Sequence, residues 1–170
     1  MNQNQNLNQT LSPRCANESW VEMVEAVMPA HTNLLHTLFG GQLMAWIDTA
    51  AALCAARHSR NICVTASIDA LHFLKPISLG WIVILKAAVN FTGQSSMEIG
   101  VRVEAENPIT GEFRHTTSAF LTFVALNSTG QRCTIPPLKI ESTDDKRRWT
   151  RAEERRKNRL LERSQKIENA

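Results

Sequence analysis

The hydrophobic pattern of the chain changes from helix-like to strand-like near residue 60. The run from Phe39 to Arg57 is apolar at nearly every position, which predicts a buried helix. Beyond it, apolar residues recur at about every second position and predict four strands, at 62–73, 81–91, 97–104 and 112–126. An alternating stretch at 19–28 with one change of phase predicts an earlier strand with a bulge, ending at Pro29.

Turn-forming sequences separate the later strands. Residues 75–80, 92–95 and 107–111 carry Pro, Gly, Asn, Ser and Thr, so that neighbouring strands can pair antiparallel. One helix with a strand before it and four after it predicts an α+β fold in which an antiparallel sheet wraps a central helix. After Pro136 and Pro137, the charged segment 144–166 predicts a C-terminal helix outside the sheet.

A chain of 170 residues suits one domain with a substantial core. We expect a disordered lead at 1–18, the domain at 19–137 and a basic helical tail at 138–170. No apolar run reaches the roughly 20 residues that cross a bilayer, and the Asn/Gln-rich start is not a secretory signal. Four cysteines without a Cys-x-x-Cys pair argue against a zinc site and a disulfide framework, which fits a cytoplasmic protein.

Positive charge is concentrated at the C-terminus. The formal net charge is +3, and residues 144–170 hold ten Lys/Arg against six Asp/Glu. Such a tail can bind nucleic acid or another polyanion, or it can form a solvated helix. The interspersed glutamates favour the solvated helix, and nucleic acid is an unlikely partner.

Asp48 is the only ionisable residue between Phe39 and Arg57. A carboxylate buried among apolar side chains is costly unless it is paired, neutralised or used in chemistry. It can therefore serve as a base or nucleophile, or it can lie on the one exposed stripe of a half-buried helix. A helix wrapped by a sheet favours the functional interpretation.

Gly40 and Gly41 stand where this helix begins. Unpaired amides at a helix N-terminus, with no side chains in front of them, can stabilise negative charge that develops on a carbonyl oxygen. Asp48 lies about 10 Å farther along the helix axis. Since that is far for one reaction centre, a second copy of the chain can bring another loop beside Asp48.

Several ordered motifs together resemble one known family. They are Asn33, Phe39-Gly40-Gly41-Gln42-Leu43-Met44-Ala45-Trp46-Ile47-Asp48, Arg57-His58-Ser59-Arg60, Val64-Thr65-Ala66-Ser67-Ile68-Asp69, Gly93-Gln94-Ser95-Ser96-Met97-Glu98 and Thr122-Phe123-Val124-Ala125. With them the chain resembles the hotdog-fold acyl-CoA thioesterases, in particular the single-domain bacterial hydrolases related to the tandem-domain mammalian brain enzyme. The resemblance covers roughly residues 21–137.

This resemblance implies hydrolysis of acyl-CoA to free fatty acid and coenzyme A, without metal or cofactor. It implies a homodimer whose sheets join edge to edge, assembled as a trimer of dimers. The thioester would lie between Asp48 and Asn33 of the partner subunit. Asp48 would act either as a base on water or as a nucleophile, Asn33 would orient the water or the carbonyl, and the Gly40 and Gly41 amides would hold the oxyanion.

Coenzyme A carries phosphates, so basic and hydrogen-bonding residues are candidates for its binding. The candidates are Arg57, His58, Arg60, Val64, Thr65, Gly93, Ser95, Ser96 and the arginines of the tail. The alternatives are a plain hairpin turn at 93–96 and helix-capping surface charges at Arg57 and Arg60.

Two histidines depart from the family pattern: His36 stands where relatives usually have glycine, and His31 where they have an acidic residue. Either could act as an alternative base. Other functions on this fold stay open, namely an acyl-CoA sensor or scaffold without turnover, and a dehydratase. A dehydratase would need a histidine paired with the acid, and the helix face of Asp48 carries none.

Overall fold

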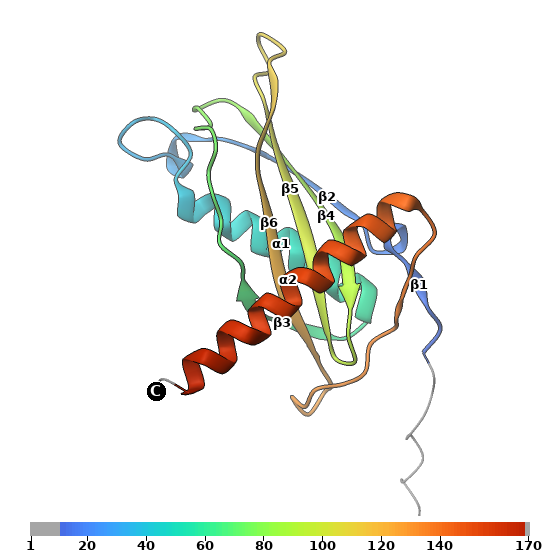
Figure 1. The fold of residues 1–170 in the computed structure, drawn as a ribbon. Helices are drawn as coiled ribbons and strands as arrows, with labels where there is room; N and C mark the ends of the chain where they lie inside the picture. Colours follow the sequence, from blue (N-terminus) through green and yellow to red (C-terminus); the bar gives the residue numbers. More distant parts are fainter. Residues whose placement is uncertain (1–10, 169–170) are drawn as a thin grey trace, which may run out of the picture.

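The computed structural model describes residues 11–168 as an antiparallel sheet with one long helix on each face (Figure 1). Helix α1 is Gly40–Ser59 and helix α2 is Thr143–Glu168. The strands are β1 (Arg14–Cys15), β2 (Val21–Ala26), β3 (Ile62–Ile68), β4 (Ile82–Thr92), β5 (Ser96–Glu106), β6 (Phe113–Leu126) and β7 (Leu138–Lys139), with 3-10 turns at Ala16–Glu18 and Pro29–His31. This arrangement confirms the predicted α+β hotdog architecture.

The main sheet has the order β2-β4-β5-β6-β3, with every neighbouring pair antiparallel. Strands β4, β5 and β6 follow one another through hairpins, whereas β2 and β3 form the two edges. The prediction of a bulge in the strand at 19–28 is wrong, because β2 pairs with β4 in unbroken register from Val21 to Ala26. Strand β3 ends at Ile68 and not at Phe73, since the apolar alternation changes phase after Ala70.

The core lies between α1 and the inner face of the sheet. Alternate residues of the central strands point to this face and are fully buried, among them Val83, Leu85, Val101, Leu121 and Phe123. Helix α1 meets them with Leu43, Ile47, Ala50, Ala51 and Cys54. Its alanines let the helix backbone come close to the sheet.

Helix α1 is not covered on all sides, which corrects the expectation of a fully wrapped helix. Gly41, Ala45, Thr49 and Leu53 form an exposed stripe along it at helical spacing. Asp48 lies at the border of this stripe and is half-buried. The carboxylate is therefore reachable from outside the single chain.

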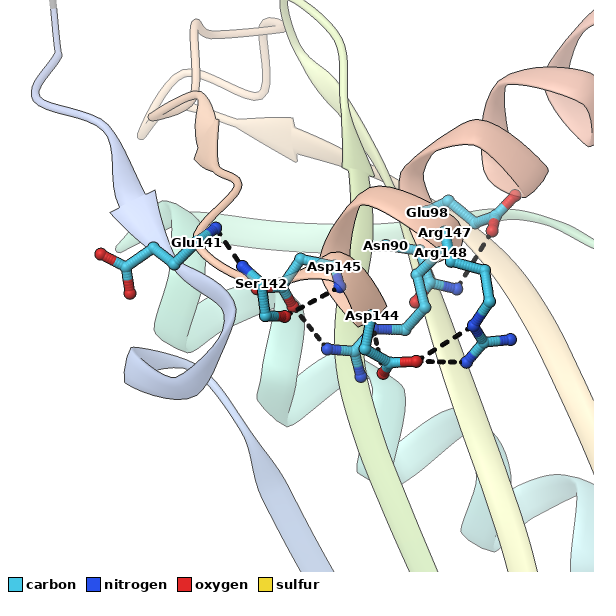
Figure 2. Close-up of polar contacts among 8 residues, drawn as sticks. All are labelled: Asn90, Glu98, Glu141, Ser142, Asp144, Asp145, Arg147 and Arg148. Carbon is cyan, nitrogen blue, oxygen red and sulfur yellow. Dashed lines mark hydrogen bonds and ion pairs between the residues drawn. The ribbon is translucent and has the colours of Figure 1, made fainter.

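Helix α2 packs on the outer face of the sheet. Ser142 caps its start, since the Ser142 hydroxyl accepts from Asp145 N and the Asp145 carboxylate accepts from Ser142 N, both at 3.0 Å (Figure 2). Ala152 is fully buried, and the ring of Trp149 lies 4.5 Å from that of Phe91. The interpretation as a solvated helix therefore holds only for the side that faces away from the sheet.

Residues 11–18 do not form part of a disordered lead, which moves the start of the ordered domain before residue 19. Strand β1 pairs in parallel with β7, and Ala16 is buried. The Arg14 guanidinium donates to the carbonyl oxygens of Arg57 and His58 at the end of α1. The part of the predicted lead at 1–10 lies outside the described residues. Between residues 11 and 168 no helix is long and apolar enough to cross a membrane.

Candidate active site

Asp48 and Thr65 form the centre of the candidate site. Thr65 points to the inner face because its partner across the ladder, Phe123, is a core residue. Its hydroxyl donates to Asp48 Oδ1 at 2.7 Å. Within residues 11–168, Asp48 Oδ2 accepts no hydrogen bond. The contact therefore fixes the carboxylate and leaves one oxygen for a ligand or a water molecule.

The start of α1 presents two free backbone donors. Phe39 is the N-cap residue and supplies no side-chain cap, and the amides of Gly40 and Gly41 find no acceptor among residues 11–168. A Cβ at Gly41 would lie 2.5 Å from the Phe39 ring, and one at Gly40 would lie 3.3 Å from Phe73. Glycine is needed there because aromatic rings fold over the helix end. Free amides with the helix dipole behind them attract an anionic oxygen.

Asn33 organises the loop that precedes α1. Its Oδ1 accepts from Leu35 N at 2.9 Å and from Thr37 N at 3.2 Å, and its Nδ2 donates to Thr37 Oγ1 at 3.0 Å. These bonds hold a tight loop whose tip exposes Leu34 completely. Within one described chain Asn33 makes no contact with Asp48, so a single chain does not bring the two predicted residues together.

The two unusual histidines lie in the same loop. His36 has a φ of 55°, a left-handed conformation that glycine adopts more easily than other residues. His31 packs edge-on against Trp46 with ring centres 5.0 Å apart, and its Nδ1 lies 3.2 Å from Met28 N. Neither imidazole contacts Asp48 within residues 11–168, so no contact supports either one as an alternative base.

The far end of α1 holds three predicted CoA-binding residues, and His58 is not available there. Its ring is fully buried, with Nε2 3.0 Å from Pro136 O and Nδ1 3.4 Å from Ser19 Oγ. Burial lowers the pKa of His58, which favours the neutral ring. The expectation for His58 is thus corrected: it joins parts of the fold and cannot meet a phosphate.

The other two residues at this helix end stay on the surface. Arg57 donates through Nη1 to Trp20 O at 2.8 Å. Arg60 is the C-cap residue in a left-handed conformation, and its guanidinium has no hydrogen bond within the described chain. Of the three, Arg60 is the residue whose side chain makes no hydrogen bond within residues 11–168.

The turn at 93–96 gathers several other candidates on the outer face. Gly93 N donates to Ser96 O at 2.7 Å, and Ser95 O accepts from Ala125 N. Ser96 and Val64 both pair with Val124, one from each side, which places them about 10 Å apart across the sheet. Thr65 faces the opposite way. The turn candidates and the carboxylate therefore lie on different faces of the sheet.

The sequence interpretation missed two features of this region. Arg156 of α2 donates to Ser96 Oγ at 3.3 Å, which singles out one arginine of the basic tail. The sequence analysis assigned Thr65 to CoA binding, whereas its hydroxyl donates to Asp48. The alternation of side chains along a strand could have indicated this, because it places Thr65 on the face opposite to Val64. Within residues 11–168 no group of three or more metal-ligating side chains comes together.

The chain matches known sequences along most of its length. Residues 35–112 match the family model of the thioesterase superfamily. The uncharacterized acyl-CoA thioester hydrolase YkhA of Bacillus subtilis is 43% identical over 81% of this chain and 80% of that protein. Acyl-coenzyme A thioesterase 11 of Mus musculus is 38% identical over 85% of this chain, which spans 25% of that longer protein.

Solved structures match in fold as well. The acyl-CoA hydrolase of Staphylococcus aureus in complex with butyryl coenzyme A, coenzyme A and coenzyme A disulfide is 38% identical, with a TM-score of 0.82 over 91% of this chain and 96% of that one. Structures of three variants of that hydrolase also match, in which an aspartate, an asparagine or a threonine is replaced by alanine. An apo-hexameric acyl-CoA thioesterase has a TM-score of 0.86 at 36% identity, over 89% of this chain and 97% of that one.

Proposed function

This chain belongs to the acyl-CoA thioester hydrolases of the thioesterase superfamily, and we propose that it hydrolyses acyl-CoA thioesters at Asp48. The observation that carries this proposal is the Asp48 carboxylate, which one hydroxyl holds in place and which keeps a free oxygen at an accessible edge of α1. The products are the free acid and coenzyme A. Coenzyme A is part of the substrate, and a cytoplasmic location stays a prediction.

Asp48 Oδ2 starts the reaction by one of two routes. As a base it removes a proton from water, which attacks the thioester carbonyl; as a nucleophile it attacks the carbonyl itself and forms a mixed anhydride that water then cleaves. In both routes the carbonyl oxygen becomes negative, and the Gly40 and Gly41 amides stabilise it by about 3 kcal/mol per donor. Thr65 keeps Oδ1 in place throughout.

A second copy of the chain completes the site. Edge strand β3, the segment that follows it and the loop before α1 expose large apolar side chains, namely Leu34, Leu35, Ile62, Val64, Ile68, Phe73 and Leu74. An apolar surface of this kind is typical of a protein interface. We place a homodimer there, with Asn33 of the partner subunit beside Asp48, and a trimer of dimers by analogy with the hexameric relative.

The variants of the Staphylococcus aureus hydrolase support these roles. Their replaced asparagine precedes the replaced aspartate by 15 residues, and the replaced threonine follows that aspartate by 17. Asn33, Asp48 and Thr65 have the same spacings. The three residues therefore correspond in spacing to the three residues that were replaced by alanine in the related enzyme.

The phosphates of coenzyme A bind on the outer side of β3. Ser96 and Arg156 offer weakly engaged donors there, beside Gly93, Ser95 and Val64, and Arg60 offers free donors at the end of α1. Because Asp48 lies on the inner face, the flexible arm of coenzyme A has to connect the two faces of the sheet. Arg57 stays a peripheral candidate because its guanidinium already binds Trp20 O.

Replacing Asp48 tests the proposal. We expect Asp48→Asn and Asp48→Ala to fold and assemble normally and to lose at least 100-fold in kcat, measured as thiol release from butyryl-CoA. Thr65→Val should lose about tenfold in kcat with little change in KM, whereas Thr65→Ser should stay near wild type, since it keeps the hydroxyl. Glu112→Gln, which removes an exposed carboxylate just before β6, is the control.

Near-wild-type turnover in both Asp48 variants would overturn the proposed role. Tight binding of butyryl-CoA by the wild type without thiol release would instead identify an acyl-CoA sensor and reject the enzyme.

A further inference from the structure

A cavity lies on the outer face of the sheet, beneath the first half of α2. Its volume is about 470 Å³, a size suited to a small-molecule ligand. Residues of β4, β5 and β6 form its floor, and α2 forms its roof. Figure 2 shows Asp144, Arg147 and Arg148 of α2 together with Asn90 and Glu98 of the neighbouring strands.

The lining of this cavity is strongly basic. One acidic residue, Asp144, lines it together with six basic ones, Lys86, Arg102, Arg147, Arg148, Arg151 and Arg155. Glutamates of β5 offset part of this charge, since Glu104 accepts from both Lys86 and Arg102, and Glu98 accepts from Arg155. Asp144 and Asp145 pair with Arg147 and Arg148.

Positive charge is left over after these pairings. Lys86 and Arg102 share a single carboxylate, and Arg151 has no ion pair or hydrogen bond within residues 11–168. The Nε of Arg148 is buried without a hydrogen-bond partner, 3.5 Å from Asp144 Oδ2. Arg147 and Arg151 lie on successive turns of α2, so both guanidinium groups project from one side of the helix.

The floor combines a polar side chain with open space. Asn90 is buried and donates to Glu98 Oε1 at 3.2 Å. It lies over Gly100, where a Cβ would come within 2.5 Å of Asn90 Nδ2. Because Gly100 has no side chain, the Asn90 amide can lie over the backbone of β5 and space remains above it. Trp20 and Phe120 supply apolar walls, with the Arg155 guanidinium 3.6 Å above the Phe120 ring.

This cavity is separate from the proposed catalytic site. Its floor residues point away from α1, whereas Thr65 and Asp48 lie on the α1 side. The part of the cavity lined by Gly100 and Arg102 is also removed from the candidate CoA-binding turn, because these residues lie about 13 and 20 Å along β5 from Ser96. Arg155 lines the end of the cavity that lies nearer to this turn.

We propose that this outer-face cavity binds a small phosphorylated anion independently of acyl-CoA. A guanidinium group can donate two parallel hydrogen bonds to a phosphate. Dissolved salt weakens this attraction less in a partly enclosed cavity than on an open surface. Arg147 and Arg151 hold the phosphates at the roof, and Lys86 and Arg102 hold them from the floor.

Titration calorimetry with inorganic pyrophosphate at fixed ionic strength tests this site. The Asp48→Asn chain should bind pyrophosphate as well as the wild type, so that the test does not depend on hydrolysis. Arg151→Gln and Arg147→Gln should each weaken binding at least tenfold without changing the KM for butyryl-CoA. Arg132→Gln, which removes an exposed arginine outside the cavity, should bind like the wild type.

Three results would overturn the proposal. The first is no pyrophosphate binding, or binding that Arg151→Gln does not weaken. The second is an equal loss with Arg132→Gln, which would mean general attraction to positive charge. The third is a parallel rise in the KM for butyryl-CoA, which would assign the cavity to the phosphates of coenzyme A. ADP in place of pyrophosphate then shows whether a nucleotide or a free phosphate is the better source of the anion.

Discussion

His36 has a backbone conformation that its residue type disfavours. Its φ of 55° brings Cβ close to the following carbonyl, at a cost of about 1 to 2 kcal/mol for residues other than glycine. Its backbone is nevertheless held, because His36 N donates to Asn33 O and His36 O accepts from Leu79 N. The strain sits in the loop that carries Asn33.

Replacing His36 by glycine should therefore stabilise the chain. We expect His36→Gly to raise the free energy of unfolding by about 1 kcal/mol, measured by urea denaturation. His36→Ala is the matched control, since it removes the imidazole and keeps the strain, and it should show no gain. An equal gain in both variants would mean that the imidazole is unfavourable and the backbone is not.

His58 should make stability depend on pH. Burial lowers its pKa in the folded state below the value of about 6.5 that it has when unfolded. Between these two pKa values the unfolded chain binds a proton that the folded chain does not. The contribution is therefore fully present above pH 6.5 and is lost as the pH falls toward the folded pKa.

Urea denaturation between pH 7.5 and 5 measures this effect. His58→Gln should be less stable than the wild type at pH 7.5, because it loses ring contacts, and its stability should fall less on acidification. His72→Gln, which replaces an exposed histidine, should keep the wild-type slope. A wild-type slope in His58→Gln would contradict the assignment.

Among the elements, α2 is attached to the sheet in part through one buried carboxylate. Glu98 of β5 is 1% exposed and accepts from Arg155 Nη2 at 2.6 Å and from Arg159 Nη2 at 2.9 Å. Arg159 also donates to Asp69 at 2.7 Å, just beyond β3. Helix α2 thus joins the centre of the sheet to the segment that follows Thr65.

Removing the charge of Glu98 should weaken this attachment. We expect Glu98→Gln to lower the free energy of unfolding by about 3 kcal/mol, because partly buried Arg155 loses its charged partner and Arg159 keeps only Asp69. The pair of exposed Glu112 with half-buried Arg114 provides the comparison, and Glu112→Gln should cost less than about 0.5 kcal/mol. Equal losses in urea denaturation would show that burial of the network adds nothing.

At the level of the whole molecule, we expect the exposed apolar residues of β3 and of the loop before α1 to take part in assembly. Leu34 is 100% exposed in the single chain and lies beside Asn33, which we assign to the partner's catalytic site. Ile109 is 90% exposed as well, but it lies in the turn between β5 and β6. The two residues have similar exposure and different expected roles.

Leu34→Asp should therefore lower the oligomeric state and the turnover together. Light scattering after gel filtration measures assembly, and thiol release from butyryl-CoA measures activity. Ile109→Asp should change neither. If Leu34→Asp leaves assembly intact, the dimer does not use this loop.

The sequence alone determined the features that depend on neighbouring residues. Apolar periodicity located α1 and the central strands, since a helix repeats every 3.6 residues and a strand every two. Gly40 and Gly41 marked the helix start, and Asp48 was recognisable because no other charge lies near it along the chain. All of these features are local.

The tertiary structure decided which distant side chains meet. Thr65 meets Asp48 across 17 residues, Arg155 meets Glu98 across 57, and His58 meets Pro136 across 78. Periodicity gives each residue a face but does not say which other segment covers it. For that reason the sequence analysis kept His58 as a ligand candidate and placed the basic tail in solvent. In the folded chain His58 is buried, and the tail helix packs on the sheet.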